Sequence, residues 1–391
     1  MHTPADRVRR ASKSRIRIMY ELAEAQPPEA DLVRLEVGEP DFDTPEHVID
    51  AAAEAARAGG THYTPNAGTT ACRAAVGQHM TEAFGVEYPT EEIVITVGGV
   101  EALQLTALSV VDAGEELLYP GPAWPNYETQ AYLADGGPVE VPLRAEEGYD
   151  LDADRMIERM GPETALVILG SPSNPTGRVF EPEAVRAVIE AAGDHGAYVI
   201  ADEVYAALTY DREPEGMAAY TDYPEHVLTV GSCSKTHAMT GWRIGWLAGT
   251  NEVTDEVVKI REATTSCPSE PGQHAAIEAL TGPQEPFEAM YEAFAERRDY
   301  VVERIEGIEG LSAPKPQGAF YVFLEPDVDA DDMAFAKYLL REHGVVLAPG
   351  SAFGEAGVGR LRLSFANSLE RLEAGFDRIE TGLRAFRSDG G

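Results

Sequence analysis

The sequence predicts an α/β fold in which a large domain holds a mostly parallel sheet flanked by helices, followed by a smaller α+β domain. Short runs rich in β-branched residues alternate with helical patterns between residues 92 and 249, which is typical of parallel strands connected by helices. A long charged helical pattern, FEAMYEAFAERRDYVVERI at 287–305, then leads into a region that mixes strands and helices. With 391 residues, the chain is long enough for both units.

The expected elements can be placed in order along the chain. In the first region we expect strands at 92–99, 115–122, 137–143, 164–172, 197–205, 227–235 and 243–249. We expect helices at 100–112, from Glu181, at 251–264 and at 268–281. In the last region we expect a strand at 319–325, a helix after Asp331, a short strand near Val345 and a strand at 360–365. We place the large domain at 41–285, and the small domain with its N-terminal arm at 1–40 and 286–391.

The charge balance excludes two classes of partner. A formal net charge of -36 would repel the phosphates of nucleic acids and the surface of an anionic membrane. The acidic excess also suits a halophilic protein that stays hydrated in concentrated salt, which is a hypothesis at this point. Lysine is scarce, because the 31 basic residues include only Lys13, Lys235, Lys259, Lys315 and Lys337.

Cysteine usage and the N-terminus indicate a cytoplasmic protein. Cys72, Cys233 and Cys267 show no paired spacing, so we expect neither a disulfide framework nor a zinc site. The basic N-terminal segment lacks the apolar stretch of a signal peptide, and no run reaches the roughly 18 apolar residues that a membrane helix needs. The nine histidines show no metal-ligand spacing.

Several polar residues and glycines fall where predicted strands end, which is where ligands collect in open α/β sheets. Gly98 and Gly99 follow one strand, Asn174 and Asp202 follow two others, and Lys235 follows Ser232 and Ser234 after a fourth. Each of these features alone would be ordinary turn chemistry or a strand-end aspartate. Together they suggest one site.

Ten segments give this set a family context. In the same order along the chain, they resemble the pyridoxal-phosphate-dependent aminotransferases of fold type I, class I, the aspartate aminotransferase superfamily, over nearly the whole length. The segments are LEVGEPDFDTP, THYTPNAGTTACRAAV, ITVGGVEAL, PGPAWPNY, SPSNPTG, ADEVY, SCSKTHAMTGWRIGW, GAFYVF, APGSAFG and RLRLSFA. The resemblance implies a fold type I enzyme that binds pyridoxal 5'-phosphate.

The resemblance also assigns cofactor-binding residues. They are Tyr63, Gly99, Val100, Glu101, Trp124, Asn174, Asp202, Tyr205, Ser232, Ser234, Lys235 and Arg243. Lys235 would form the internal aldimine, and an amine with a reference pKa of about 10.4 needs a desolvated or cationic setting to be reactive. Arg243, the two serine hydroxyls and the backbone amides at 99–101 would hold the phosphate. We expect the Glu101 side chain to point away from it.

The resemblance assigns catalytic roles to Lys235, Asp202 and Tyr205. Asp202 would keep the pyridine nitrogen protonated, so that electrons released from the substrate Cα can enter the ring. Tyr205 and Asn174 would contact the ring hydroxyl, and Trp124 would stack on the ring. The freed Lys235 amine would then act as general base and general acid.

The substrate site and the assembly are expected on the same grounds. Arg362 resembles the arginine that binds the substrate α-carboxylate, with Gly38, Trp124 and Asn174 completing the substrate site. Tyr63 resembles a tyrosine that reaches the phosphate of the neighbouring subunit, which implies a homodimer. No metal is expected.

The predicted reaction is ping-pong transfer of an amino group from an L-amino acid to a 2-oxo acid, with 2-oxoglutarate as the expected acceptor. Val100 stands where aspartate-using bacterial relatives often carry a lysine, so aspartate, aromatic, branched or broad-range donors stay open. A β-lyase or a synthase would keep the same central residues, and it is one alternative. A cofactor-sensing binding module is the other, and the acidic balance and the missing DNA-binding domain disfavour it.

Overall fold

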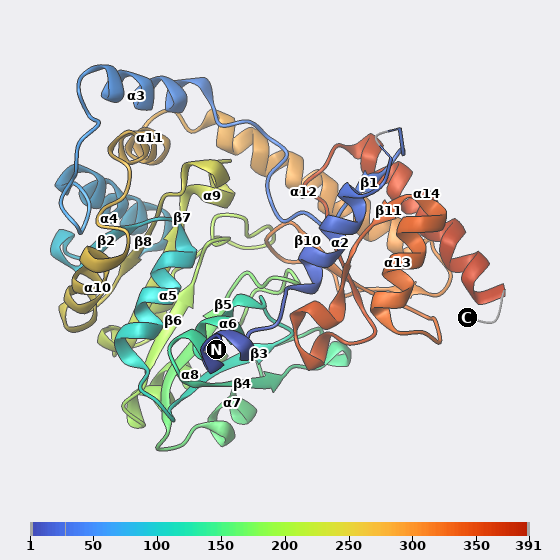
Figure 1. The fold of residues 1–391 in the computed structure, drawn as a ribbon, viewed down its shortest axis with the longest axis horizontal. Helices are drawn as coiled ribbons and strands as arrows, with labels where there is room; N and C mark the ends of the chain where they lie inside the picture. Colours follow the sequence, from blue (N-terminus) through green and yellow to red (C-terminus); the bar gives the residue numbers. More distant parts are fainter. Residues whose placement is uncertain (1–2, 28, 389–391) are drawn as a thin grey trace.

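The computed structural model describes residues 3–27 and 29–388, and it confirms the α/β architecture (Figure 1). A seven-stranded sheet has the order β2-β8-β7-β6-β5-β3-β4. Its strands are β2 (Ile93–Thr96), β3 (Glu116–Gly121), β4 (Gly137–Pro142), β5 (Thr164–Gly170), β6 (Tyr198–Asp202), β7 (Val227–Ser232) and β8 (Gly245–Ala248). Of these, β8 alone runs antiparallel to its neighbours. Every strand lies inside a run that the sequence predicted.

Helices cover both faces of this sheet because its strands are apolar on both sides. In β6, Val199 and Ala201 face one core and Ile200 faces the other. The first face is covered by α4 (Thr70–Phe84), α7 (Ala153–Arg159), α8 (Pro182–Asp194) and α11 (Glu270–Thr281), with α3 (Glu46–Arg57) packed on α11. The second face is covered by α5 (Gly99–Val110), α6 (Asn126–Leu133) and α10 (Asn251–Thr264).

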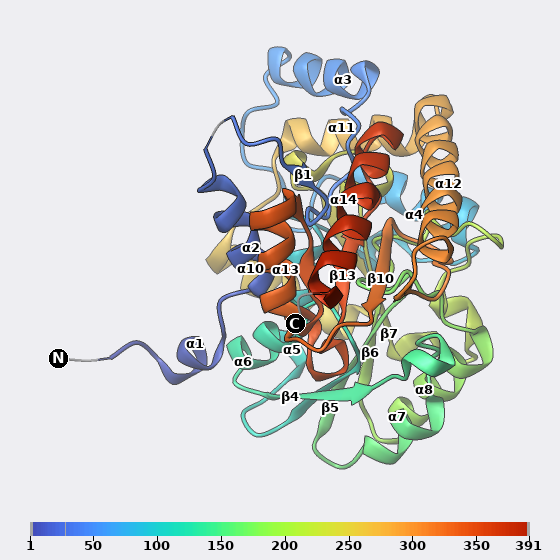
Figure 2. The same ribbon diagram turned by 90° about the vertical axis from the view of Figure 1, so that its right-hand side faces the viewer.

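The rest of the chain forms a second, smaller layer of strands and helices (Figures 1 and 2). An antiparallel sheet has the order β12-β13-β10-β9, from β9 (Leu311–Ser312), β10 (Tyr321–Pro326), β12 (Ala348–Pro349) and β13 (Leu361–Ser364). The helices here are α2 (Arg15–Glu24), α12 (Glu285–Glu306), α13 (Asp332–His343) and α14 (Leu369–Ser388), whereas α1 (Asp6–Arg10) contacts α6 of the large layer. Near the N-terminus, β1 (Val33–Arg34) pairs in parallel with β11 (Val345–Val346). The domain boundaries at 40/41 and 285/286 stay a prediction.

The carboxyl ends of the parallel strands meet at one edge of the large sheet, and this edge positions the site. Asp202 ends β6 and Ser232 ends β7, while the short helix α9 (Cys233–Thr236) begins directly after β7. Gly99 begins α5 just after β2. Residues from α2, β10 and β13 approach the same edge, so the N-terminal and C-terminal parts of the chain close over it.

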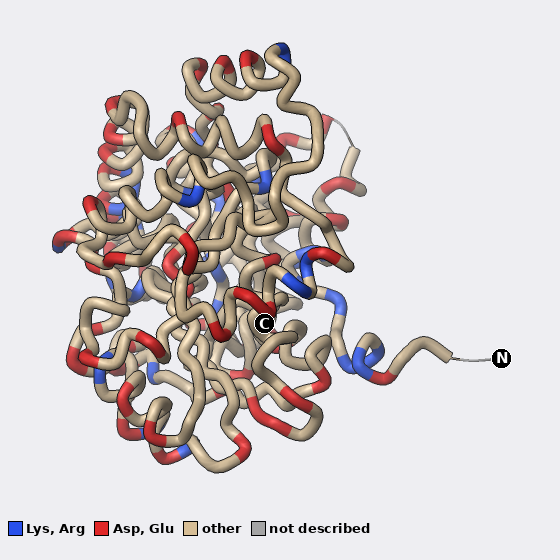
Figure 3. Tube along the Cα trace, turned by 90° about the vertical axis from the view of Figure 1, so that its left-hand side faces the viewer, with Lys and Arg blue, Asp and Glu red and all other residues tan. Residues whose placement is uncertain are grey.

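Acidic residues are spread along the whole trace and outnumber basic ones, 67 to 31 in the sequence, while the N-terminal arm carries a group of basic residues (Figure 3). In the part of the chain that the structure describes, no helix has the length and apolarity to cross a bilayer. No group of histidine, cysteine and carboxylate side chains there could hold a metal ion.

This charge distribution predicts salt-dependent stability. Salt screens repulsion among exposed like charges, so we expect the melting temperature to rise by about 5 °C or more between salt-free buffer and molar salt. Differential scanning calorimetry at increasing potassium chloride concentrations measures this. A melting temperature that is already maximal without added salt would contradict the halophilic hypothesis.

Candidate active site

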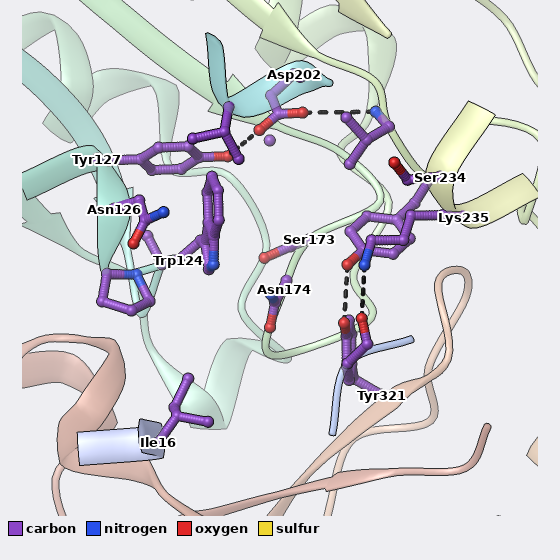
Figure 4. A pocket seen from close by; sticks show the side chains of 18 of the residues that line it. Ile16, Trp124, Asn126, Tyr127, Ser173, Asn174, Asp202, Ser234, Lys235 and Tyr321 are labelled. Carbon is purple, nitrogen blue, oxygen red and sulfur yellow. Dashed lines mark hydrogen bonds between the residues drawn. The ribbon is translucent and has the colours of Figure 1, made fainter. Parts of the chain in front are cut away.

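A cavity of about 650 Å³ lies at the carboxyl edge of the large sheet, which is a size suited to a cofactor and a small substrate. Figure 4 shows its walls, with Trp124 and Tyr127 on one side and Lys235 and Tyr321 on the other. The predicted site residues that line it are Gly38, Gly99, Val100, Trp124, Asn174, Asp202, Tyr205, Ser232, Ser234, Lys235, Arg243 and Arg362. The fold therefore gathers twelve of the fourteen predicted residues in one place.

Lys235 lies in α9, one turn beyond the end of β7. Its Nζ donates a hydrogen bond of 2.6 Å to the carbonyl oxygen of Gly38, which lies 197 residues earlier in the chain. Burial lowers the pKa of this amine to about 8, and the positive charges of Arg362 and Arg243 act in the same direction, whereas Glu39 and Asp202 oppose them. An amine with this pKa is unprotonated far more often than a free lysine at neutral pH, so it can act as a nucleophile or a base.

Asp202 ends β6 and is only 5% exposed. The hydroxyl of Tyr127 donates a 2.7 Å hydrogen bond to its Oδ2 (Figure 4). Burial raises the pKa of Asp202 to about 6, while the hydrogen bond from Tyr127 opposes the rise. A buried carboxylate of this kind lacks a full countercharge, and a protonated ring nitrogen would supply one.

Tyr205 and Asn174 each make a hydrogen bond to another side chain of the cavity. The hydroxyl of Tyr205 lies 2.8 Å from that of Tyr321, and burial raises the pKa of Tyr205 well above its usual value. Asn174 accepts a hydrogen bond of 3.0 Å from Nη1 of Arg362 through its side-chain oxygen. Both residues could still offer a hydrogen bond to a ligand, because a phenol oxygen and an amide group each make more than one.

Arg362 is the buried cation of this site. It lies on β13, is 3% exposed, and donates through Nη2 to the carbonyl oxygen of Glu36 at 2.5 Å. Its guanidinium carbon lies 4.5 Å from the ring centroid of Tyr321. Burial lowers the pKa of the guanidinium, and its Nε is buried without a hydrogen-bond partner. A carboxylate ligand would provide both the countercharge and further acceptors.

An anion cradle forms where α5 begins. Helix N-termini attract anions through free backbone N–H groups and the helix dipole. Gly98 has φ of 75°, and a Cβ atom built there would come within 2.4 Å of Arg243 Nη2, so only glycine lets the arginine lie against this turn. Ser232 Oγ lies 2.9 Å from Ser234 Oγ and 3.1 Å from the Ser234 amide nitrogen. Two hydroxyls, the first amides of α5 and a guanidinium thus meet here.

Two predicted residues lie outside the cavity. The backbone N–H of Glu101 donates to the Gly98 carbonyl at 3.1 Å, which leaves the amides of Gly99 and Val100 for an anion. As expected, the Glu101 side chain points away, because its carboxylate binds Arg261 Nη2 at 2.8 Å and the Val97 amide at 2.6 Å. Tyr63 is 89% exposed and does not contribute to the cavity of its own chain.

The residues present fit pyridoxal phosphate. The cradle suits a phosphate, Trp124 offers an aromatic face, Asp202 offers a carboxylate for a ring nitrogen, and Lys235 offers an amine for the aldehyde. The partnerless Nε of Arg362 marks a further place for an anionic group in the same cavity.

Comparison with known proteins agrees with this geometry. A family model described as Aminotransferase class I and II matches residues 30–379. The chain belongs to this family. Members of this family transfer amino groups and depend on pyridoxal phosphate. Because the chain belongs to the family, it is an aminotransferase. It is 35% identical over 385 residues to an aspartate aminotransferase of Pyrococcus horikoshii, with 97% of each chain covered.

Two further relatives extend the comparison. The chain is 35% identical to the aromatic-amino-acid aminotransferase 2 of Thermococcus litoralis, with 97% of this chain and 98% of that protein covered. The solved structure of the aspartate aminotransferase from Thermus thermophilus with maleate matches this aminotransferase with a TM-score of 0.93 at 36% identity. That match covers 98% of this chain and 100% of the other.

Two tyrosines that shape the site were not among the residues predicted from the sequence. Tyr127 donates to Asp202, and Tyr321 contacts both Tyr205 and Arg362. Both lie in segments that carried the family resemblance, PGPAWPNY and GAFYVF, so the signal was present. Their partners could not be read from the sequence because each contact joins segments at least 40 residues apart.

The Tyr127–Asp202 bond predicts a pH dependence of cofactor binding. An ionised Asp202 would hold a protonated ring nitrogen, so we expect the affinity of the apoprotein for pyridoxal phosphate to fall as the pH drops through about 6. Tyr127→Phe removes a hydrogen bond to the ionised form and should move this midpoint upward by about one pH unit. Fluorescence titration at several pH values measures it.

Tyr132→Phe is the matched control, because Tyr132 lies on the same helix and its hydroxyl contacts Glu128 instead. It should leave the midpoint unchanged. An unaltered midpoint in Tyr127→Phe would refute the role of this bond.

Proposed function

We propose that this aminotransferase moves the amino group of an L-amino acid to a 2-oxo acid by a ping-pong reaction in which Lys235 carries the proton. The observation that carries the proposal is the half-buried amine of Lys235, whose pKa is lowered to about 8, in one cavity with Asp202, Arg243 and Arg362. A base with this pKa can accept a proton from a substrate Cα near neutral pH and return it.

The other residues bind and orient. Arg243, Ser232, Ser234 and the amides of Gly99 and Val100 hold the phosphate, and Asp202 holds the proton on the ring nitrogen. Bound pyridoxal phosphate supplies an electron sink for the electrons released at Cα.

On the substrate side, Arg362 grips the α-carboxylate in two-pronged fashion, with Asn174 beside it. Trp124 covers the ring face, and Tyr205 and Asn174 contact the ring hydroxyl. The N–H of Gly38 assists with the carboxylate, while its carbonyl oxygen keeps the Lys235 amine in place.

The names of the relatives indicate which amino donors to propose. Their names include aspartate, aromatic-amino-acid and aspartate/prephenate aminotransferases, and one solved relative carries maleate, a four-carbon dicarboxylate. We propose aspartate and aromatic amino acids as donors and 2-oxoglutarate as the acceptor. Three free cysteines fit a cytoplasmic location, which we also propose.

We propose that the active unit is a homodimer in which Tyr63 reaches the phosphate of the partner. Its high exposure would be unusual for a tyrosine without a partner. The loop that carries it is tied to the phosphate cradle, because the fully buried Arg261 donates to the Asn66 carbonyl at 2.8 Å and to Glu101 on α5. One arginine thus links the cradle to the loop that would serve the other subunit.

Lys235→Ala tests the reaction. The variant should lose about 10²–10⁴-fold in kcat, because it lacks the proton-transferring amine. Borohydride reduction of the wild-type holoenzyme followed by peptide mapping should place the pyridoxyl group on residue 235.

Product analysis with aspartate or phenylalanine and 2-oxoglutarate should show glutamate formation. Release of ammonia without glutamate would indicate a lyase instead. A pyridoxyl group on Lys259 or another lysine would refute the assignment of Lys235.

Tyr63→Phe tests the dimer. Loss of one hydrogen bond to a charged phosphate should raise the cofactor dissociation constant about 10-fold or more. Tyr223→Phe, another exposed tyrosine, is the control and should change nothing. Analytical ultracentrifugation should give a dimer, and a monomer that binds the cofactor with full affinity would contradict the proposal.

A further inference from the structure

A buried carboxylate lies beside the arginine that the proposed function assigns to the substrate α-carboxylate. Glu36 is 1% exposed and lines the same cavity as Arg362. Its backbone carbonyl oxygen accepts the 2.5 Å hydrogen bond from Arg362 Nη2, so its side chain is attached close to the guanidinium. The Glu36 carboxylate and a bound acid would therefore act on the same cation, although the proposed function gives Glu36 no role.

The Glu36 carboxylate has one oxygen that its ion pair does not use. Arg34 Nη2 contacts Glu36 Oε1 at 2.5 Å. Glu36 Oε2 is buried and has no hydrogen-bond partner among the residues that the structure describes. A buried acceptor without a partner costs free energy, so its presence in a folded protein calls for an explanation.

Arg34 does not neutralise Glu36 completely, because it also forms an ion pair of 2.8 Å with Glu24. Two carboxylates thus share one guanidinium, and this group keeps one negative charge in excess. Burial raises the pKa of Glu36, while the hydrogen bond and charge of Arg34 and the charge of Arg362 oppose the rise. Within the described chain, the carboxylate whose charge acts on Arg362 is that of Glu36.

The other groups around Arg362 are neutral. Its Nη1 donates to the side-chain oxygen of Asn174 at 3.0 Å, and its guanidinium carbon lies 4.5 Å and 5.0 Å from the ring centroids of Tyr321 and Phe353. Burial raises the pKa of Tyr321, so its hydroxyl keeps its proton. Because charges interact strongly where water is excluded, Glu36 sets how much free positive charge a ligand carboxylate meets on Arg362.

We propose that Glu36 is a positioning residue that moderates the affinity of Arg362 for carboxylates, so that acids leave the site readily. The inference rests on the proposed function, because it assigns Arg362 to the α-carboxylate. In a ping-pong reaction this arginine must bind and release an amino acid and a 2-oxo acid in turn. Tighter binding of substrate and transition state alike would lower KM without raising kcat, so a stronger arginine would not speed the chemical step.

The test compares Glu36→Gln with Glu24→Gln in the holoenzyme. Glu36→Gln keeps the side-chain shape and removes the charge. Glu24→Gln removes the other carboxylate partner of Arg34, which does not line the cavity. The probe is the monocarboxylate 3-phenylpropionate, titrated by calorimetry and by the absorbance of the bound cofactor. We expect its dissociation constant to fall about 5-fold or more in Glu36→Gln and to change less than about 2-fold in Glu24→Gln.

The sign of this change separates the proposal from a structural role, because a variant that had lost packing would bind the probe more weakly. Glu36→Met also removes the charge at similar volume, and it replaces Glu36→Gln if that variant does not fold. Glu36→Asp keeps the charge and should stay within about 3-fold of the wild type. Arg362→Lys should weaken binding about 10-fold or more, because a point charge replaces the planar fork. An unchanged or weaker constant in the uncharged variants overturns the inference, as does an unchanged constant in Arg362→Lys.

Steady-state kinetics give a second readout. In Glu36→Gln, KM for aspartate and KM for phenylalanine should fall in parallel by about 5-fold or more without a rise in kcat, because both donors carry an α-carboxylate. A change confined to one donor would contradict the inference. If the holoenzyme transfers no amino group to any 2-oxo acid, the proposed function fails, and binding of 3-phenylpropionate alone still decides the role of Glu36.

Discussion

The desolvation of the half-buried Lys235 amine is the constraint on which the rest of the structure depends. A lysine in water keeps its proton at neutral pH, and this one loses it more easily because the cavity withholds water from it. Three parts of the chain that lie far apart in sequence together form this cavity. The end of β7 carries the lysine, the segment at Gly38 accepts its hydrogen bond, and β13 brings Arg362 close enough for its charge to act.

Each buried charge in the site is held by groups that belong to a different element. Arg362 depends on the Glu36 carbonyl and on Asn174, and Asp202 depends on Tyr127. Arg261 removes the carboxylate of Glu101 from the start of α5, where it would repel a phosphate. Because buried charges without partners are costly, these second contacts are as necessary to the arrangement as the residues that would touch the cofactor.

The sequence predicted the strands and most of the site because both follow from local pattern. Apolar runs define β2 and β6 through β8, and the parallel order puts Asp202, Ser232 and Gly99 at one edge whatever the details of packing. The side chains that these residues contact could not be predicted from local sequence pattern. Nothing near Tyr321 in sequence indicates its contact with Tyr205. The exposure of Tyr63 likewise had to come from the structure.

The contrast between surface and cavity bears on how an anionic substrate enters. A net charge of -36 creates a potential that repels amino-acid carboxylates and phosphates from a distance. At molar salt the Debye length is about 3 Å, so this repulsion hardly extends beyond the surface. The buried Arg362 acts over contact distances with little water between, so salt weakens its attraction for a carboxylate much less. The same high salt that would relieve repulsion in the fold would therefore leave the attraction within the site in place, so an acidic surface and a cationic cavity are compatible in one aminotransferase.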